Sequence, residues 1–331
     1  MNRADFLTRM PKVDLHTHLT GTIGPRTLAE LAKRAGVTLP SDILKIDSPE
    51  DFFEKLNIVS SVLTTPEDFE LVAYEYMTRS AEQSNLRHCE LAFNPTLYPA
   101  SDYVAIVAAI SRGARQAADE HGMSWVLIPA VLREQGVGVA EQLLDLVLAN
   151  RTEETAGIGL DGDELVAPPE LFVEVFRKAG QAGLKRTAHV TYPPATRVGY
   201  CIEELGCDRI DHGYYVLEDE DEARRVRDLG VPITVCHSMT CASRGWNPGN
   251  HPIATMLKMD FNLVLGTDDE AFVDTNIGRE YVIVCDGYSM TTEAVEAITR
   301  RGIDAAWVGD DRKAELHREV DAAFASLDVT D

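Results

Sequence analysis

The stretch Lys12-Val13-Asp14-Leu15-His16-Thr17-His18 alternates polar and apolar residues and ends with two histidines two positions apart. The run Lys12–His16 predicts a β-strand. In an extended chain residues i and i+2 point to the same side, so His16 and His18 are placed to bind one metal ion through two imidazoles. The alternative is a pair of surface histidines in a loop. The rest of the chain has to decide between the two interpretations.

Seven further short runs rich in Val, Ile and Leu follow the first, separated by longer stretches with helical periodicity. The eight predicted strands are Lys12–His16, Leu86–Phe93, Trp125–Leu132, Gly157–Asp161, Leu184–His189, Arg209–His212, Val231–Cys236 and Asn262–Thr267. Near-continuous apolar strands that alternate with helices indicate a parallel sheet covered by helices. Eight such units favour a closed (β/α)8 TIM barrel. A doubly wound open sheet is the competing fold, but no GxGxxG motif follows the first strand.

The segments between the predicted strands have the pattern of helices. These helices are expected over Arg26–Ala35, Asp102–Glu120, Pro169–Ala182, Ala195–Leu205 and Asp219–Asp228. Residues 41–80 form a longer, mostly helical excursion after the first strand, and we expect it to be a cap inserted over the barrel mouth. No Pro-, Ser- or Gly-rich linker flanks this segment, so residues 1–331 are predicted to form one domain. Residues 304–331 are also predicted to be helical.

The composition excludes several classes of function. The chain has 31 basic and 54 acidic residues, a net charge of −23, so nucleic-acid and membrane partners are not expected and a small molecule is the expected substrate. It has no apolar run of about 18 residues and no signal-peptide pattern, which predicts a cytoplasmic protein. The six cysteines form no CxxC pair and are expected to be reduced thiols. The combination of HxE and PCxxC motifs that marks cytidine-type deaminases is absent. The oligomeric state stays open.

Polar side chains gather at the predicted strand ends. They are His16, His18, Asn94, Arg133, Asp161, His189, His212, His237, Asp268 and Asp269. In a TIM barrel the C-terminal ends of the strands and the loops after them carry the catalytic groups. Five of the nine histidines are therefore expected at one end of one barrel, which favours a shared site over isolated structural histidines.

Three imidazoles and one carboxylate suit a borderline divalent ion, and zinc is the preferred candidate. We predict one zinc ion per chain, bound by His16, His18, His189 and Asp268. A water molecule on such an ion ionises near pH 7 and becomes a hydroxide nucleophile. His212 is the expected proton shuttle beside that water. The adjacent Asp269 is then free to face the substrate.

Five motifs, in order along nearly the whole chain, resemble those of the adenosine deaminase family, which includes adenosine and adenine deaminases. They are Met10–Leu19, Gly159–Glu164, Gly183–His189, Arg209–Gly213 and Leu265–Asp269. The resemblance implies a (β/α)8 barrel, a catalytic zinc and hydrolytic release of ammonia from an aminopurine. It implies that the catalytic residues include His212, Asp268 and the residue at position 192. The expected substrate-binding residues are His18, Thr20, Gly162, Asp269 and His237.

The chain departs from the family pattern where the substrate ring is protonated. The family has a glutamate three residues after the third metal histidine, and this chain has Tyr192 there. A phenol with an ordinary pKa near 10 is a weaker acid than a tuned carboxyl group, so Tyr192, His237 and Glu164 are all candidate proton donors. Thr20 replaces an aspartate that faces the sugar of a nucleoside. Glu270 replaces the proline that usually follows the double aspartate.

Three functional hypotheses follow from the sequence. The first is a zinc-dependent hydrolytic deaminase of an aminopurine or related amino-heterocycle with a non-standard proton donor. The second is a zinc hydrolase of the same fold that cleaves another C–N bond in a specialised biosynthetic pathway. The third is a catalytically silent protein that binds a purine-like ligand. The predicted retention of all four metal ligands and of His212 disfavours the third hypothesis.

Overall fold

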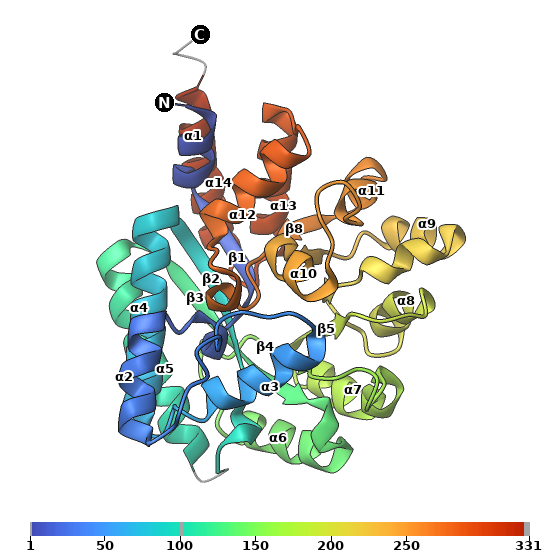
Figure 1. Ribbon diagram of the computed structural model, residues 1–331. Helices are drawn as coiled ribbons and strands as arrows, with labels where there is room; N and C mark the ends of the chain where they lie inside the picture. The colour runs from blue at the N-terminus through green and yellow to red at the C-terminus, as the bar shows by residue number, and fades with distance from the viewer. Residues whose placement is uncertain (1, 100–101, 328–331) are drawn as a thin grey trace.

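The computed structural model describes residues 2–99 and 102–327, and eight parallel strands form its centre (Figure 1). The strands are β1 (Lys12–His18), β2 (Leu86–Phe93), β3 (Ser124–Leu132), β4 (Gly157–Asp161), β5 (Lys185–Val190), β6 (Arg209–His212), β7 (Ile233–Val235) and β8 (Leu263–Leu265). Each strand pairs in parallel with the next, from β1 to β8. A parallel bridge between Thr17 and Asp268 joins the segment after β8 back to β1. The predicted TIM barrel is confirmed.

The strands form because their residues suit burial on both faces. β4, β6, β7 and β8 are buried at every position. β1 is also buried throughout, although Lys12, Asp14, His16 and His18 are polar. Their burial is possible because the barrel interior supplies partners; the Thr267 hydroxyl, for example, donates to Asp14 Oδ2 at 2.6 Å. The barrel therefore has a polar interior at the end where β1 carries its histidines.

Helices surround the barrel and agree with the predicted alternation (Figure 1). They are α1 (Arg3–Arg9), α2 (Pro25–Ala35), α3 (Pro49–Ser60), α4 (Pro66–Ser84), α5 (Tyr103–His121), α6 (Val137–Ala149), α7 (Val173–Gln181), α8 (Thr196–Glu203), α9 (Glu220–Leu229), α10 (His237–Arg244), α11 (Ile253–Lys258), α12 (Ile277–Gly287), α13 (Thr292–Ala305) and α14 (Asp310–Ala325). Single-turn 3-10 helices follow several strands, among them η1 (Leu19–Thr22), η4 (Arg133–Gln135) and η7 (Glu270–Val273).

The predicted cap segment 41–80 contains two helices with different positions. α4 packs on α5 and β2 as part of the outer ring. Both helices contact η1, but α3 also contacts α10, and its apolar side chains line the cavity at the strand ends. Each helix begins with a proline in its first turn, and the Ser48 hydroxyl caps α3 by accepting from the Asp51 amide. Of the predicted cap segment, α3 therefore lies at the barrel end and α4 belongs to the outer ring. That residues 1–331 form one domain stays a prediction.

The predicted helical segment from residue 304 is helical over most of its described length, because α13 ends at Ala305 and α14 spans Asp310–Ala325, while residues 306–309 and 326–327 lie outside the helices. α13 and α14 pack on each other, and α13 packs on β8 and β1. Residues 328–331 of that prediction lie outside the described residues. All six cysteines are free, and all but Cys241 are buried. In the described ranges no helix has both the length and the apolar character needed to cross a membrane.

Candidate metal centre and active site

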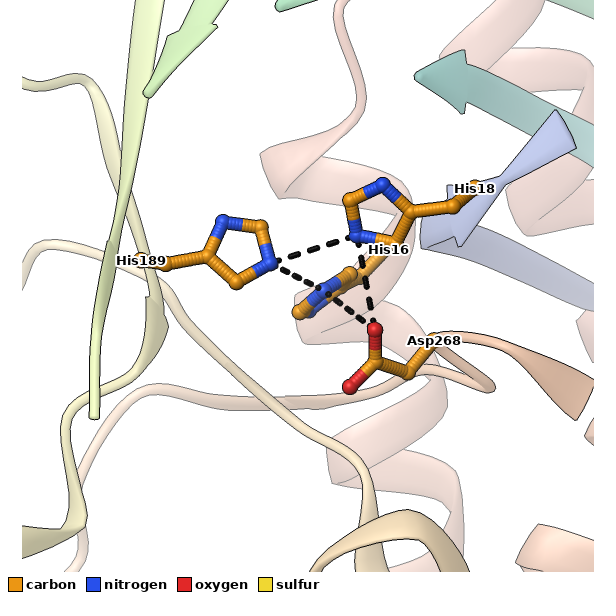
Figure 2. Close-up of side chains that lie close together, drawn as sticks. All are labelled: His16, His18, His189 and Asp268. Carbon is orange, nitrogen blue, oxygen red and sulfur yellow. Dashed lines mark hydrogen bonds and ion pairs between the residues drawn. The ribbon is translucent and has the colours of Figure 1, made fainter. Parts of the chain in front are cut away.

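Four side chains meet at the C-terminal end of the barrel. β1 contributes His16 and His18, β5 contributes His189, and the segment after β8 contributes Asp268, all pointing to one position (Figure 2). His189 Nε2 lies 3.1 Å from His16 Nε2 and 3.2 Å from His18 Nε2. Asp268 Oδ1 lies 3.4 Å from the Nε2 atoms of both His16 and His18. His16 and His18, two positions apart on β1, thus point to the same side of the strand, as expected for an extended chain.

The size of this cluster can be compared with that of a metal site. Zinc lies about 2.0–2.1 Å from imidazole nitrogen in a tetrahedral site, which places neighbouring ligand atoms about 3.3–3.4 Å apart. The separations here are 3.1–3.4 Å. Three imidazole nitrogens and a carboxylate oxygen are also donors that zinc prefers. The four residues therefore fit a divalent ion of this kind without rearrangement.

The outward-facing nitrogens of the imidazoles are occupied by other groups. Asp161, at the end of β4, places Oδ1 3.1 Å from His189 Nδ1 and Oδ2 3.6 Å from His18 Nδ1. The Asn94 amide donates to the same carboxylate at 3.0 Å. His16 Nδ1 lies 2.9 Å from the Thr234 hydroxyl. These contacts place a polar oxygen beside each Nδ1, and Nε2 is the ring nitrogen that faces the common centre.

The charges of these groups are strongly coupled. Burial by itself would raise the pKa of Asp268, but the imidazoles of His16, His212 and His18 hold it well below its usual range. Burial lowers the pKa of His189, and the carboxylate of Asp161 outweighs that effect and raises it to about 9. Burial lowers the pKa of His18. A carboxylate and an imidazole of opposite charge thus stabilise each other in a site that is otherwise costly to charge.

His212 lies at the end of β6 beside the four potential ligands. Its Nε2 is 3.4 Å from Asp268 Oδ2, and its Nδ1 has no hydrogen-bond partner in the part of the chain that the structure describes. Burial holds the pKa of His212 well below its ordinary value, so the ring is neutral and able to accept a proton. Both His212 and Asp268 have positive φ, 72° and 62°, which is uncommon for residues with a side chain. Such strained backbone is typical of functional sites.

Asp269 follows Asp268 and lies buried against the loop after β1. A Cβ atom on Gly21 would lie only 1.9 Å from Asp269 Oδ1, so this approach requires glycine. Burial, together with the neighbouring Asp268, raises the pKa of Asp269 well above its ordinary value. Glu270 is buried as well, but it pairs with Arg79 at 2.7 Å. Glu270 does not line the cavity.

A cavity of about 120 Å³ opens above these groups. The apolar part of its lining comes mainly from α3, with further residues from the segment after β2, the end of β3 and α10. Its members are Pro49, Phe52, Phe53, Leu56, Leu97, Leu132 and Met239. The opposite side is polar and includes His18, His189, His212, Asp268 and Asp269. A flat apolar ring with polar edge atoms is the kind of ligand that such a cavity accommodates.

The structure brings most of the predicted site residues to this cavity. Tyr192 and Gly162 line it together with the residues above. Gly162 has φ of +87°, and a Cβ there would lie 1.9 Å from Glu134 Oε2, so the close approach of this loop to Glu134 depends on glycine. Burial raises the pKa of Tyr192, so its phenol stays protonated at neutral pH. Tyr192 therefore has a proton or hydrogen bond to offer at the position where the family has glutamate.

Four predicted residues do not line the cavity: the proposed ligand His16, and Thr20, His237 and Glu164. His237 is buried behind it, with Nε2 3.0 Å from the Tyr288 hydroxyl, and faces a separate surface pocket. Glu164 supports the loop after β5, because its Oε2 accepts from the Thr191 and Tyr192 amides at 2.7 and 3.2 Å. Its Oε1 accepts from Arg197 at 2.9 Å. The structure therefore brings neither His237 nor Glu164 to a place where it reaches a ligand.

Several residues of the site were not singled out from the sequence. Arg244 and Glu134 line the cavity, and so do the aromatic residues of α3. A signal existed for Glu134, because it directly follows Arg133 at a recognised strand end. Arg133 itself is buried and donates to the carbonyl oxygens of Asp161 and His189, which ties the ends of β4 and β5 together. Arg244 stands at the end of a helix, where no strand-end pattern marks it.

Comparisons with known proteins agree with this geometry. The sequence profile of the family described as adenosine deaminase matches residues 11–323. An adenine deaminase from Rhodospirillum rubrum is 31% identical over 328 residues, covering 96% of this chain and 98% of that protein. A crystal structure of an amidohydrolase from Burkholderia ambifaria with bound zinc has a TM-score of 0.91 and 31% identity, and the match covers 100% of this chain and 95% of that one. An adenine deaminase from Arthrobacter aurescens has a TM-score of 0.86 and 28% identity over 95% of this chain and 98% of that one.

Proposed function

Because the chain belongs to the adenosine deaminase family, we propose that it is a zinc-dependent hydrolytic deaminase that converts an amino group on a purine or related heterocycle to a carbonyl group and releases ammonia. The observation that carries the proposal is the meeting of four ligand atoms, 3.1–3.4 Å apart, at the bottom of a cavity with one apolar and one polar side. The adenine deaminases among its relatives support an aminopurine as the substrate class.

The proposed ligands for one zinc ion are His16, His18, His189 and Asp268. When bound, such an ion supplies the Lewis acidity that activates water at neutral pH. His212 is the proposed base for the attacking water, because it lines the cavity beside the proposed ligands, with its Nε2 3.4 Å from Asp268 Oδ2. The carboxyl group of Asp269 is proposed to form a hydrogen bond with a ring nitrogen and so to orient the heterocycle.

Tyr192 is the proposed donor to the ring atom next to the reacting carbon. Of the three candidates considered, it is the one that lines the cavity. The oxygen of the attacking water becomes the carbonyl oxygen, the C–N bond to the amino group breaks, and the departing nitrogen leaves as ammonia. We propose that α3 covers the heterocycle during this reaction, because its apolar side chains face the cavity.

Ammonia release tests this function. The purified protein with zinc is mixed with adenine, adenosine, adenosine 5′-monophosphate and a panel of other amino-heterocycles, and ammonia is measured against a metal-free sample. Release from at least one compound, lost on metal removal, supports the deaminase. A zinc-loaded protein that converts none of them but opens or cleaves another C–N bond supports the second hypothesis, another hydrolase of this fold.

A pair of substitutions tests the role of Tyr192. We expect Tyr192→Phe to lower kcat for the best substrate roughly tenfold or more, because the hydrogen bond to the ring is lost. We expect Tyr192→Glu to raise the rate on adenine, since a carboxyl group is the stronger acid at the same position. Steady-state rates with zinc content measured in parallel check both. Unchanged kcat in Tyr192→Phe with full zinc occupancy would exclude Tyr192 as the donor.

A further inference from the structure

We propose that the substrate carries an anionic substituent, a carboxylate or a phosphate, that binds to Arg244 at the wall of the cavity. This inference rests on the proposed function, because it takes the cavity to be the binding site of an amino-heterocycle. It adds a chemical requirement that the metal centre does not impose: a negative charge on the substrate, away from the reacting amino group.

Arg244 is the last residue of α10 and lines the same cavity as Tyr192. Among the described residues it is the only lysine or arginine that does so. The chain as a whole carries a net charge of −23, so its surface repels an anionic ligand at long range. A single fixed cation in the cavity is therefore the feature that would allow an anionic substrate to bind there.

The guanidinium of Arg244 is held in place by two contacts. Its Nη2 donates to the Thr191 carbonyl oxygen at 3.0 Å, and its central carbon lies 4.3 Å from the centre of the Tyr192 ring. The ring covers one face of the guanidinium, and the carbonyl uses one of its five N–H groups. The remaining N–H groups at the edge are available, and because the side chain is already ordered, binding costs less conformational entropy.

Arg244 has no carboxylate partner within ion-pair distance. Across residues 2–99 and 102–327, no ion pair of 4.0 Å or less involves it. Four acidic residues line the cavity: Glu134, Asp161, Asp268 and Asp269. Glu134 accepts from the Asp163 amide at 3.3 Å, and Glu50 at the start of α3 is exposed. The guanidinium of Arg244 is thus ordered and forms no direct ion pair among the described residues. An arginine in this state is suited to a bidentate bond to a carboxylate or phosphate.

The ligand chemistry follows from the rest of the lining. Phe52, Phe53 and Leu56 provide apolar contacts for a flat ring, and three of the four proposed zinc ligands, His18, His189 and Asp268, line the same cavity. A substituent on the ring would then reach Arg244 while the amino group faces the metal centre. Carboxylate and phosphate each present a pair of oxygens that can accept two parallel N–H bonds from a guanidinium, so both are tested.

The experiment compares neutral and anionic substrates of the same ring. KM and kcat are measured for adenine, for (adenin-9-yl)acetic acid and for adenosine 5′-monophosphate, with the zinc-loaded wild-type protein, Arg244→Met and Arg244→Lys. We expect Arg244→Met to raise KM for at least one anionic compound tenfold or more while KM for adenine changes less than threefold. Arg244→Lys should raise KM less than Arg244→Met does, because lysine keeps the positive charge but lacks the two parallel N–H groups of arginine. Preference for the acetic acid or the phosphate identifies the group.

Arg197→Met is the matched control. Arg197 supports the same loop through Glu164 but does not line the cavity, so its loss should affect neutral and anionic substrates equally. If Arg244→Met raises KM for adenine and for the anionic compounds by the same factor, Arg244 only supports Tyr192 and the proposal is wrong.

Inorganic phosphate provides a readout that does not depend on turnover. Calorimetry of phosphate binding to the zinc-loaded protein should show a loss of affinity of tenfold or more in Arg244→Met. Phosphate that binds the metal centre alone would bind both proteins equally and overturn the proposal. If no compound releases ammonia, the proposed function fails, but a loss of phosphate affinity in Arg244→Met still supports the anion site.

Discussion

At the scale of single residues, the carboxylate of Asp161 decides how two of the three imidazoles present themselves. It lies 3.1 Å from His189 Nδ1 and 3.6 Å from His18 Nδ1, while the Asn94 amide fixes its own position. The sequence predicted Asp161 at a strand end, but it did not show that its carboxylate would lie beside the Nδ1 atoms of His189 and His18. The partner of a ligand depends on which strand end lies next to it, and that is a property of the closed barrel.

Substitution of Asp161 tests this arrangement. Asp161→Asn should weaken zinc binding about 10- to 100-fold, because the amide no longer fixes the charge and orientation of His189 and His18. Competition with a chromogenic zinc chelator measures the affinity. Asn150→Asp, at the end of α6, is a distant control of opposite charge change that should leave zinc affinity unaltered. An Asp161→Asn protein with wild-type zinc affinity would show that the imidazoles are oriented by the backbone alone.

At the scale of secondary-structure elements, α3 forms the apolar wall of the cavity. The sequence predicted a helical cap over residues 41–80, and the structure divides this segment between α3 at the barrel end and α4 in the outer ring. Amphipathic periodicity identifies both helices but not the surface that each one covers, because either apolar face can be buried against a barrel or over its mouth. The difference is decided by the packing of α4 on α5.

The wall itself is open to a test with two neighbouring phenylalanines of α3. Phe53→Ala should raise KM for the heterocycle roughly tenfold with a smaller change in kcat, since about 1–2 kcal/mol of apolar contact with the ring is removed. Phe52 also packs edge-to-face on Phe272, with ring centres 5.4 Å apart, so Phe52→Ala should lower the stability as well. Steady-state kinetics and thermal unfolding separate the two effects. A change confined to kcat in Phe53→Ala would place the reacting ring away from α3.

At the scale of the whole molecule, the proposed ligands link distant parts of the chain. His16 and His18 belong to β1, His189 belongs to β5, and Asp268 follows β8. The bridge of Thr17 with Asp268 joins the first strand to the segment after the last one, and it is supported by the His18 and Asp268 amides, which donate to the Asp268 and His16 carbonyl oxygens at 3.1 and 2.8 Å. A metal ion bound here therefore depends on a closed barrel and is expected to stabilise it.

Metal removal should accordingly lower the thermal stability. A ligand present at about 1,000 times its Kd stabilises the folded state by roughly 4 kcal/mol. With an unfolding entropy of about 2.1 cal/mol/K per residue, this corresponds to a rise in Tm of roughly 6 °C for a chain of 331 residues. Calorimetry with and without zinc measures the shift. His16→Ala and Asp268→Ala should show no zinc-dependent shift, whereas His237→Ala should retain it; full zinc occupancy in the first two variants would refute the proposed ligand set.

The sequence by itself determined the barrel and the place of the metal centre. Strand period and strand-helix alternation are local properties, and parallel strands in a barrel all bring their C-terminal ends to one edge. For that reason His16, His18, His189 and Asp268 could be named before their distances were known. The same reasoning located Asp269 and His212 beside them.

Only the tertiary structure decided which further groups reach the cavity. Glu164 and His237 lie just after the ends of β4 and β7, but Glu164 accepts from the amides after β5 and His237 packs beside Tyr288, and neither lines the cavity. Arg244 and Phe53 belong to α10 and α3, and the packing of these helices on their neighbours decides that both side chains line the cavity. Side-chain direction in loops and helix ends depends on contacts between elements far apart in the chain, so no local pattern encodes it. The substrate is decided at this level, where Tyr192 and Arg244 lie together.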